Sequence, residues 1–491
     1  MLFNSIDFLL FFPAVTAVFL FVPKKCRYLW LLAASYYFYM GWNPEYALLL
    51  AFSTLVTYGS SIFMEACGTR HVLAKKCWAA CSLVSNLGLL GLFKYADFIL
   101  VNLERVLTHI GVRGGVDRRL DLLLPVGISF YIFQALGYTF DVYKGEIKAE
   151  RNIFRYALFV SFFPQLVAGP VERSKHLLPQ LRKISEIQVW DFDRMRDGFL
   201  LMLWGLFQKL VIADRAALLV DTVICHYESY GFFEIVLAAV LFAVQIYCDF
   251  GGYSDIARGA AKVFGISLMQ NFRQPYLAVD IRDFWRRWHR SLTSWFTDYL
   301  YIPLGGNRCG ILRKYLNILL VFGISGLWHG ASWNFVAWGL LHAVYQIAGD
   351  CRHRIIKRMG YGQERMGLSF SARLRKMAGT FLLVDFAWIF FASKSLRHAC
   401  GVIRQMFTVF QTAGIYETGL DRGNWACLSA GIALLLTADI LHEKQISVSA
   451  FLNRQECWFR WTLYVGLAVS VVLFGIYGVD YDAGAFIYFQ F

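Results

Sequence analysis

The chain has 491 residues, of which 58% are hydrophobic and only 17% are charged. Soluble domains contain roughly 45–50% apolar and about 25% charged residues, so this composition excludes an ordinary soluble protein and indicates a membrane protein with many spans. Lysine and arginine exceed aspartate and glutamate by 14. We interpret this excess as basic loops beside anionic lipid headgroups rather than as a nucleic-acid-binding surface.

Apolar segments recur from end to end, and a membrane span needs about 20 mostly apolar residues. No polar block of domain size interrupts them, so we expect one membrane-embedded domain over residues 1–491. The first segment carries Asp7 and lacks a basic leader and a cleavage site, so we expect it to be retained. The predicted spans are Leu2–Val22, Tyr28–Trp42, Ala47–Met64, Trp78–Phe93, Phe98–Ile110, Pro125–Tyr143, Ile153–Gly169, Gly198–Ile212, Phe232–Phe250, Tyr315–Ile347, Gly379–Ala392, Asn424–Leu441 and Phe459–Gly478.

The distribution of basic residues predicts the orientation. Lysines and arginines follow the first and third segments, whereas the short loop after the second has none, which places the N-terminus outside the cell. Basic residues flank Ile153–Gly169 on both sides, and this segment contains Pro164. We therefore predict a re-entrant hairpin there, because non-helical backbone at membrane depth is tolerated only where protein or a wet cavity surrounds it.

The basic and aromatic stretch Asp280–Tyr301 predicts one amphipathic helix. Asp280 is placed to cap its start, with Asp283 three residues later. Four apolar residues recur at helical spacing: Phe284, Trp288, Leu292 and Trp295. An adjoining face would carry Arg282, Trp285, Arg286 and His289. The arginines could simply reach lipid phosphates from a surface helix, or they could bind a phosphate-bearing ligand.

The apolar run Tyr315–Ile347 is too long for one span. As a single helix it would extend about 50 Å, against a hydrocarbon core of about 30 Å, so we expect a break at the glycines of GISGLWHG, residues 323–330. His329 would then lie near mid-membrane, beside Trp328 and near Asn334. We interpret this histidine as functional, with a structural histidine bonded to a carbonyl as the alternative. His342, about 20 Å further along a helix, is not expected to contact it.

Polar residues also interrupt apolar runs elsewhere. The segment IYCDFGGYSDIARG, residues 246–259, holds Asp249, Ser254 and Asp255, which are further candidates for the site. Isolated polar residues of this kind are also common as bonds between membrane helices. The eleven cysteines are scattered, and neither paired CxxC elements nor an HExxH motif occurs, so we expect no metal site.

An imidazole at the break suggests a chemistry. Neutral histidine, with an ordinary pKa of about 6.5, is the usual general base near neutral pH. His329 could remove the proton from a hydroxyl group that then attacks an activated acyl group. No Gly-Xaa-Ser-Xaa-Gly motif occurs, so we expect direct transfer rather than a serine acyl-enzyme.

Seven segments together resemble one family. They are MLFNSIDFLLFFP (residues 1–13), LPVGISFYIFQALGYTFDVY (124–143), FFPQLVAGPVER (162–173), CDFGGYSDIARG (248–259), NFRQPYLAVDIRDFWRRWHRSLTSWFTDYLYIPLGGN (271–307), GLWHGASWNFVAWG (326–339) and FIYFQF (486–491). The chain resembles the membrane-bound O-acyltransferases, in particular the bacterial branch that contains the alginate O-acetylation membrane protein. The D-alanyl transfer protein of teichoic acid is a nearby relative of that branch.

This resemblance implies a fold and a site. The fold would be an all-α polytopic membrane protein with about 10–12 transmembrane helices around a thinned centre, together with re-entrant and amphipathic helices. His329 matches the family's invariant histidine and His289 its second conserved histidine, and both would be catalytic. Residues expected near a donor or acceptor tunnel are Trp285, Arg286, Arg282, Trp328, Asn334, Asp249, Ser254 and Asp255.

The resemblance also implies a reaction. An acetyl or other acyl group would pass from a cytoplasmic thioester, either acetyl-CoA or an acyl-phosphopantetheine carrier protein, to a hydroxyl acceptor for O-acetylation of an extracytoplasmic polysaccharide. No cofactor would be tightly bound. An SGNH-type O-acetyltransferase or other polysaccharide machinery outside the inner membrane would be the partner. The alternatives are D-alanyl transfer from a carrier protein and a transporter or flippase without chemistry, although no internal repeat supports the latter.

Overall fold

The computed structural model of the chain describes residues 1–68, 70–111, 120, 122–167, 169–308, 310–359 and 369–477. The terminal FIYFQF segment lies outside these residues. Throughout the described ranges the regular secondary structure is helical, which confirms the predicted all-α class. The chain divides into two compact units: Met1–Phe199 with Ala257–Met269, and Leu200–Ile256 with Gln270–Phe491.

Six helical segments of the described chain are long and apolar enough to cross a bilayer. They are Tyr46–Cys67, Val72–His109, Phe232–Val263, Ile311–His329, Arg422–Glu443 and Cys457–Phe474, and Ile6–Phe21 is a shorter apolar helix. The chain is therefore a multi-pass membrane protein, as the composition predicts.

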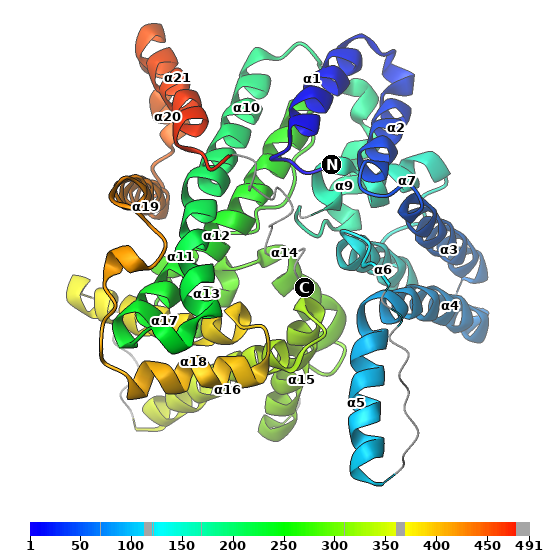
Figure 1. The fold of residues 1–491 in the computed structure, drawn as a ribbon. Coiled ribbons are helices and arrows are strands. Elements are labelled where there is room, and N and C mark those ends of the chain that lie inside the picture. Colours follow the sequence, from blue (N-terminus) through cyan, green and yellow to red (C-terminus); the bar gives the residue numbers. More distant parts are fainter. Residues whose placement is uncertain are drawn as a thin grey trace. The chain divides into compact units, whose positions relative to one another are not determined.

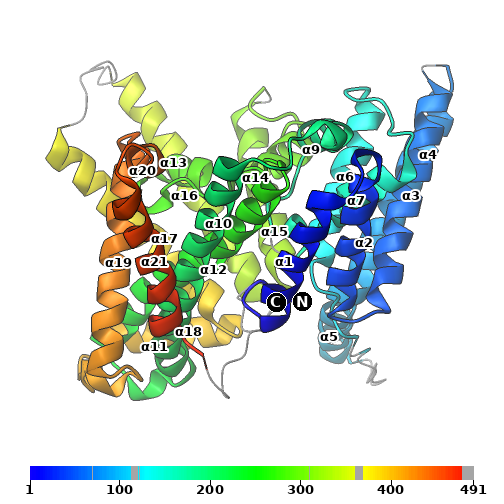
Figure 2. The same ribbon diagram turned by 90° about the horizontal axis from the view of Figure 1, so that it is seen from above.

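The first unit consists of short and long helices (Figure 1). Its helices are α1 (Ile6–Phe21), α2 (Arg27–Met40), α3 (Tyr46–Cys67), α4 (Val72–Leu90), α5 (Ala96–His109), α6 (Ile128–Lys144), α7 (Ile153–Ser161), α8 (Phe163–Leu166) and α9 (Ser174–Arg182), with the start of α10 (Phe192–Leu206) and the end of α12 (Phe232–Val263). Helix α2 packs on α7, and α3 packs on α4 and α6. Helices α3 and α4 lie side by side in both views (Figures 1 and 2).

The two spans predicted at Trp78–Phe93 and Phe98–Ile110 correspond to helices α4 and α5, which follow each other without a loop. Residues Val72–His109 form one helical run of 38 residues, with a π-helical turn at Gly91–Tyr95 between α4 and α5. The connecting residues include no proline that would remove a helical hydrogen bond, so the backbone continues through the predicted gap. The predicted gap is therefore a π-helical turn between two α-helices and not a loop, and whether each helix crosses the bilayer stays a prediction.

Helix α6 forms the buried centre of the first unit. Gly127 precedes it with a φ of 73°, and a methyl group there would lie 2.5 Å from the carbonyl oxygen of Leu166, so glycine is required on both counts. The side chain of Gln134 donates a hydrogen bond to the carbonyl oxygen of Phe159 in α7. This buried amide therefore joins two helices of the unit, a common role for polar residues in membrane proteins.

The segment predicted as a re-entrant hairpin forms two short helices. Helix α7 ends at Ser161 and α8 begins at Phe163, and the intervening Phe162 is fully buried. The helices are much shorter than a span, while their depth in the bilayer stays a prediction.

The second unit carries the remaining helices. They are the end of α10, α11 (Asp214–Cys225), the start of α12, α13 (Ile281–Arg287), α14 (Arg290–Phe296), α15 (Ile311–His329), α16 (Trp333–Arg358), α17 (Phe370–Ala392), α18 (Leu396–Thr408), α19 (Arg422–Glu443), α20 (Val448–Leu452) and α21 (Cys457–Phe474), with a π-helical segment at Phe207–Ala213. Helices α15 and α16 pack along each other as a hairpin (Figure 1).

The hairpin turns where the glycines predicted a break. Helix α15 ends at His329, Gly330 is its C-cap, and α16 begins at Trp333. Two glycines let the helices approach closely: a methyl at Gly326 would lie 2.2 Å from the carbonyl oxygen of Phe335, and one at Gly339 would lie 2.2 Å from that of Phe322. The predicted interruption of Tyr315–Ile347 is therefore confirmed.

Candidate active site

The two candidate histidines meet inside the second unit. His329 is the last residue of α15 and is 4% exposed, and His289 lies between α13 and α14 and is 1% exposed. Their ring centroids are 6.4 Å apart. The indole of Trp328 contacts both rings, at 5.0 Å from His329 and 6.1 Å from His289. Residues 40 positions apart in the sequence thus form one buried group.

The α15–α16 hairpin fixes the position of His329. Trp338 of α16 lies edge-on to the imidazole, with centroids 5.1 Å apart, and Phe391 of α17 contacts it at 5.4 Å. Asn334 anchors the start of α16, because its side-chain nitrogen donates hydrogen bonds to the carbonyl oxygens of Ser393 (2.8 Å) and Phe390 (3.2 Å). Asn334 therefore supports the wall beside the histidine through the end of α17.

The position of His289 differs from the prediction. The stretch Asp280–Tyr301 does not form one helix: α13 ends at Arg287, and His289 has a left-handed backbone with φ 41° and ψ 53° before α14 begins. Histidine is among the few non-glycine residues enriched in this conformation. The predicted cap is confirmed, since Asp280 accepts a hydrogen bond of 2.7 Å from the backbone of Asp283. The prediction of one continuous helix over Asp280–Tyr301 is wrong.

Aromatic rings line the other sides of the His289 imidazole. Phe250 of α12 contacts it edge-on at 4.7 Å between centroids, and Phe272 lies at 6.4 Å. Both phenylalanines are buried. The site is therefore a pair of imidazoles within an aromatic wall, an environment in which charged groups are strongly disfavoured and neutral imidazole is preferred.

The face predicted on α13 separates into two parts. Trp285 points inward, is 8% exposed, and contacts Trp338 at 5.8 Å and His342 at 5.1 Å. Arg282 and Arg286 are exposed instead. Trp285 therefore contacts Trp338, which in turn contacts His329, while the arginines of the same helix face outward.

A cluster of basic groups surrounds Asp350 near Arg282. The carboxylate accepts hydrogen bonds from Lys314 (2.7 Å), Arg354 (2.8 Å), Tyr315 (3.1 Å) and Arg282 (3.4 Å). Burial raises the pKa of Asp350, but the hydrogen bonds from Lys314, Arg354 and Tyr315 outweigh that effect and lower it to about 2. The aspartate therefore stays charged and holds three cations at one place.

The polar candidates from α12 bond to residues of neighbouring segments. Asp249 forms an ion pair of 2.6 Å with Lys209, which also pairs with Asp214 at 2.8 Å. Asp255 accepts a hydrogen bond of 3.2 Å from Gln208. These carboxylates therefore stabilise the junction of α12 with the π-helical segment. Lys209 is not among the residues predicted from the sequence, although a lysine within the apolar run WGLFQKLVIA indicates a buried, paired or functional charge.

Ser254 leads to a residue that the sequence did not single out. Its hydroxyl accepts a hydrogen bond of 2.8 Å from the side chain of Asn271, and Asn271 in turn accepts one of 2.6 Å from Ser291. All three residues are at most 2% exposed. Ser291 is two residues after His289, so this chain of bonds reaches the backbone that carries the imidazole.

His342 is a third buried histidine close to the group. It is fully buried, and among the residues that the structure describes neither of its ring nitrogens has a hydrogen-bond partner. The indole of Trp338 contacts both His342 and His329, with centroids 5.2 Å and 5.1 Å away. The turn of the hairpin thus brings both histidines into contact with one indole, which a distance measured along a straight helix does not predict.

Known proteins with similar sequences bear on this site. A sequence model of the membrane-bound O-acyltransferase family matches residues 146–366. The chain is 36% identical to a probable alginate O-acetylase of Pseudomonas aeruginosa over 440 residues, covering 89% of this chain and 80% of the relative. It is 35% identical to a peptidoglycan O-acetyltransferase of Helicobacter pylori, covering 77% and 73%. A teichoic acid D-alanyltransferase of Bacillus subtilis is 24% identical, covering 57% of this chain and 71% of the relative.

Proposed function

Because the chain belongs to the membrane-bound O-acyltransferase family, we propose that this O-acyltransferase moves an acetyl group from a cytoplasmic thioester to a hydroxyl acceptor for the O-acetylation of an extracytoplasmic polysaccharide. The observation that carries the proposal is the buried pair His289–His329, with ring centroids 6.4 Å apart. Relatives named for alginate and peptidoglycan support acetyl as the group and a polysaccharide as the final acceptor.

His329 serves as the general base in this reaction. It removes the proton of the acceptor hydroxyl as the oxygen attacks the thioester carbonyl, so that a carbon–oxygen bond forms and the carbon–sulfur bond breaks. The proton then passes to the leaving thiolate, which leaves no net proton uptake. His289, whose ring also contacts Trp328, orients the reacting group through a ring nitrogen. The aromatic wall keeps both imidazoles neutral and excludes water.

The donor is acetyl-CoA or an acetylated phosphopantetheine carrier protein, and no tightly bound cofactor is required. Both donors carry phosphate, which guanidinium groups bind well. Exposed Arg282 and Arg286 support this assignment, because they lie on the helix whose Trp285 reaches toward the histidine group. Trp328 and Asn334 belong to the wall beside His329.

The protein works in the cytoplasmic membrane of its cell, with its N-terminus outside and basic loops inside. An SGNH-type O-acetyltransferase or related polysaccharide machinery outside receives the acetyl group. D-alanyl transfer from a carrier protein is the second candidate, and the lower identity to the teichoic acid D-alanyltransferase makes it the weaker one. The family assignment supports an enzyme over a transporter or flippase.

The test uses purified protein in lipid nanodiscs with radiolabelled donors. We expect label to leave acetyl-CoA, or an acetylated carrier protein assayed in parallel, in the presence of a hydroxyl acceptor. His329→Ala removes the base and abolishes transfer. His226→Ala is the matched control, because that histidine is exposed and bonds only near the end of α11.

Three results decide the outcome. Loss of transfer in His329→Ala at unchanged thermal stability supports the proposal. Full activity of His329→Ala would overturn the general-base role. Transfer of D-alanine but not acetate would replace the acetyl group with the second candidate.

A further inference from the structure

We propose that Asn271 and Arg287 are positioning residues that hold the left-handed backbone of His289, and so set the direction of its imidazole for acyl transfer. The inference rests on the proposed role of His289. Asn271 bonds to the two residues that follow the histidine, and Arg287 lies two residues before it.

The backbone at His289 needs external support. A φ of 41° is unfavourable for a residue with a side chain, and such a conformation persists only where surrounding contacts determine it. The same segment would continue α13 into α14 without a break if helical preference alone decided, because it contains neither proline nor glycine. Tertiary contacts therefore produce the corner.

The first contacts run along the backbone. The N–H of Arg290 donates to the carbonyl oxygen of Asn271 at 2.9 Å, and the N–H of Arg273 donates to the carbonyl oxygen of Arg287 at 3.0 Å. The segment from Asn271 to Gln274 thus lies alongside Arg287–Arg290. Gln274 also has a positive φ, of 42°, so both segments bend away from regular structure at the same place.

Asn271 holds the corner from the buried side. Its side chain donates to Ser254 of α12 at 2.8 Å and accepts from Ser291 of α14 at 2.6 Å. Asn271 is 1% exposed and Ser291 is fully buried, so water does not compete for these bonds. One amide therefore connects α12, the 271–274 segment and the first turn of α14.

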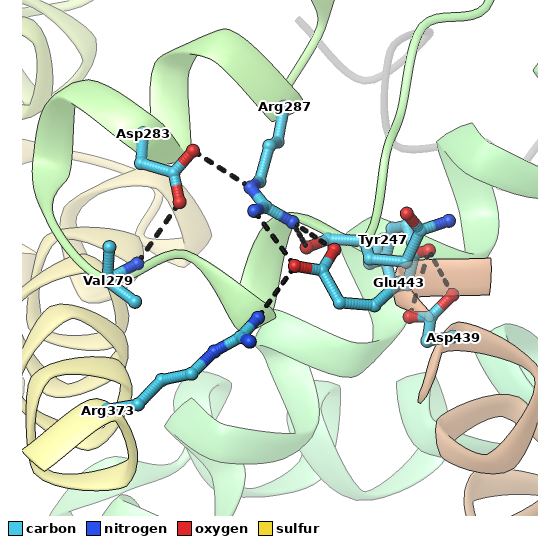
Figure 3. A network of polar contacts seen from close by, with 8 residues as sticks. Tyr247, Val279, Asp283, Arg287, Arg373, Asp439 and Glu443 are labelled. Carbon is cyan, nitrogen blue, oxygen red and sulfur yellow. Dashed lines mark hydrogen bonds and ion pairs between the residues drawn. The ribbon is translucent and has the colours of Figure 1, made fainter. Parts of the chain in front are cut away.

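Arg287 holds the corner from the other side (Figure 3). Its guanidinium group binds Asp283 at 3.0 Å and Glu443 of α19 at 2.7 Å, and it reaches the carbonyl oxygen of Gln274 at 3.5 Å. Arg373 of α17 binds the second oxygen of Glu443 at 2.7 Å. The end of α13, two residues before His289, is thereby tied to α17 and α19.

These two sets of bonds predict a particular kinetic effect. Loosening the corner leaves the imidazole present but lets it leave its productive direction, and a displacement of about 1 Å in an active site reduces the rate about a hundredfold. Donor binding depends on other residues and should change little. A residue that only stabilised the fold would lower the melting temperature without this selective loss.

The first experiment compares Asn271→Ala with Asn317→Ala. Asn317 is a matched control because it is a buried asparagine of the same unit whose side chain bonds the carbonyl oxygen of Leu304, in another segment. We expect kcat of Asn271→Ala to fall about ten- to a hundredfold with KM within about twofold. The control should retain kcat. Equal losses in both variants, or a loss confined to KM, would overturn the assignment of Asn271.

The second experiment uses Arg287→Lys, a milder change that keeps the charge and loses the forked geometry. We expect kcat to fall several-fold, and Glu443→Gln to produce a similar loss that does not add to it in the double variant. Unchanged kcat in Arg287→Lys and Glu443→Gln, at full thermal stability, would remove Arg287 from the proposal.

A background variant separates this inference from the proposed function. In His289→Ala, adding Asn271→Ala should cause no further loss of the residual rate, because the side chain that Asn271 positions is gone. A full additional loss would mean that Asn271 acts elsewhere. If His289→Ala itself keeps full activity while His329→Ala is inactive, the positioning role fails and the proposed base survives. If both histidine variants are active, the proposed function fails first.

Discussion

Gly326→Ala tests whether the close approach of α15 and α16 sets the position of His329. The added methyl group would lie 2.2 Å from the carbonyl oxygen of Phe335 and 2.9 Å from its carbonyl carbon, and both belong to the backbone of α16. Ordinary van der Waals contact begins at 3.4 Å, so the helices must separate by about 1 Å. His329 follows three residues later and moves with α15.

The magnitude follows from that displacement. Overpacking of a well-packed contact costs about 1–3 kcal/mol of stability, and a shift of about 1 Å at reacting atoms lowers the rate about a hundredfold. We therefore expect Gly326→Ala to fold, to melt at a lower temperature, and to lose most of its acyl transfer in nanodiscs. Donor binding should change less than kcat, because Arg282 and Arg286 lie on a different helix.

Two glycines on the same hairpin provide matched controls. A methyl at Gly323, three residues earlier on α15, would meet only Leu340 at an ordinary 3.7 Å, and one at Gly349 of α16 would meet nothing within 4 Å. Both alanine variants should keep activity and stability. The reasoning is refuted if Gly326→Ala transfers acyl groups at the normal rate, or if Gly323→Ala and Gly349→Ala lose as much.

Two further predictions concern charged groups. Lys209→Met leaves Asp249 and Asp214 buried without their shared cation. We therefore expect the free energy of unfolding, measured by denaturant titration in detergent, to fall by about 3–5 kcal/mol. A loss below about 1 kcal/mol would contradict this expectation. The hydrogen bond to Glu172 raises the pKa of His176 in the folded protein. The pair therefore stabilises the fold fully below the ordinary histidine pKa of about 6.5. This contribution is lost as the pH rises through the higher pKa of the folded protein. Between pH 6 and 8 the wild-type melting temperature should therefore decline more steeply than that of His176→Asn, and parallel profiles would show that the pair has no such effect.

Particular residues show which structural features the local sequence predicts and which it does not. Asp280 as a helix cap and the interruption at the glycines around His329 follow from local chemistry, and the structure has both. The gap predicted between residues 93 and 98 stays helical, because no proline interrupts the backbone there, and it forms a π-helical turn between α4 and α5. The corner at His289 is the opposite case, since its local sequence favours a helix and contacts with Asn271 and Arg287 override it.

The sequence by itself determined that the chain lies in a lipid bilayer, that its fold is all-α, and that His289 and His329 are candidate site residues. Apolar runs of span length require helices in a bilayer, and an imidazole at a glycine break stands out because its burial is costly. Only the tertiary structure decided how these parts meet. The contact between His289 and His329, the indole of Trp285 beside Trp338, and the ion pair of Lys209 with Asp249 join segments far apart in the chain, and no local preference encodes such contacts. Periodicity describes one helix at a time, whereas the left-handed corner at His289 depends on the segments packed against it.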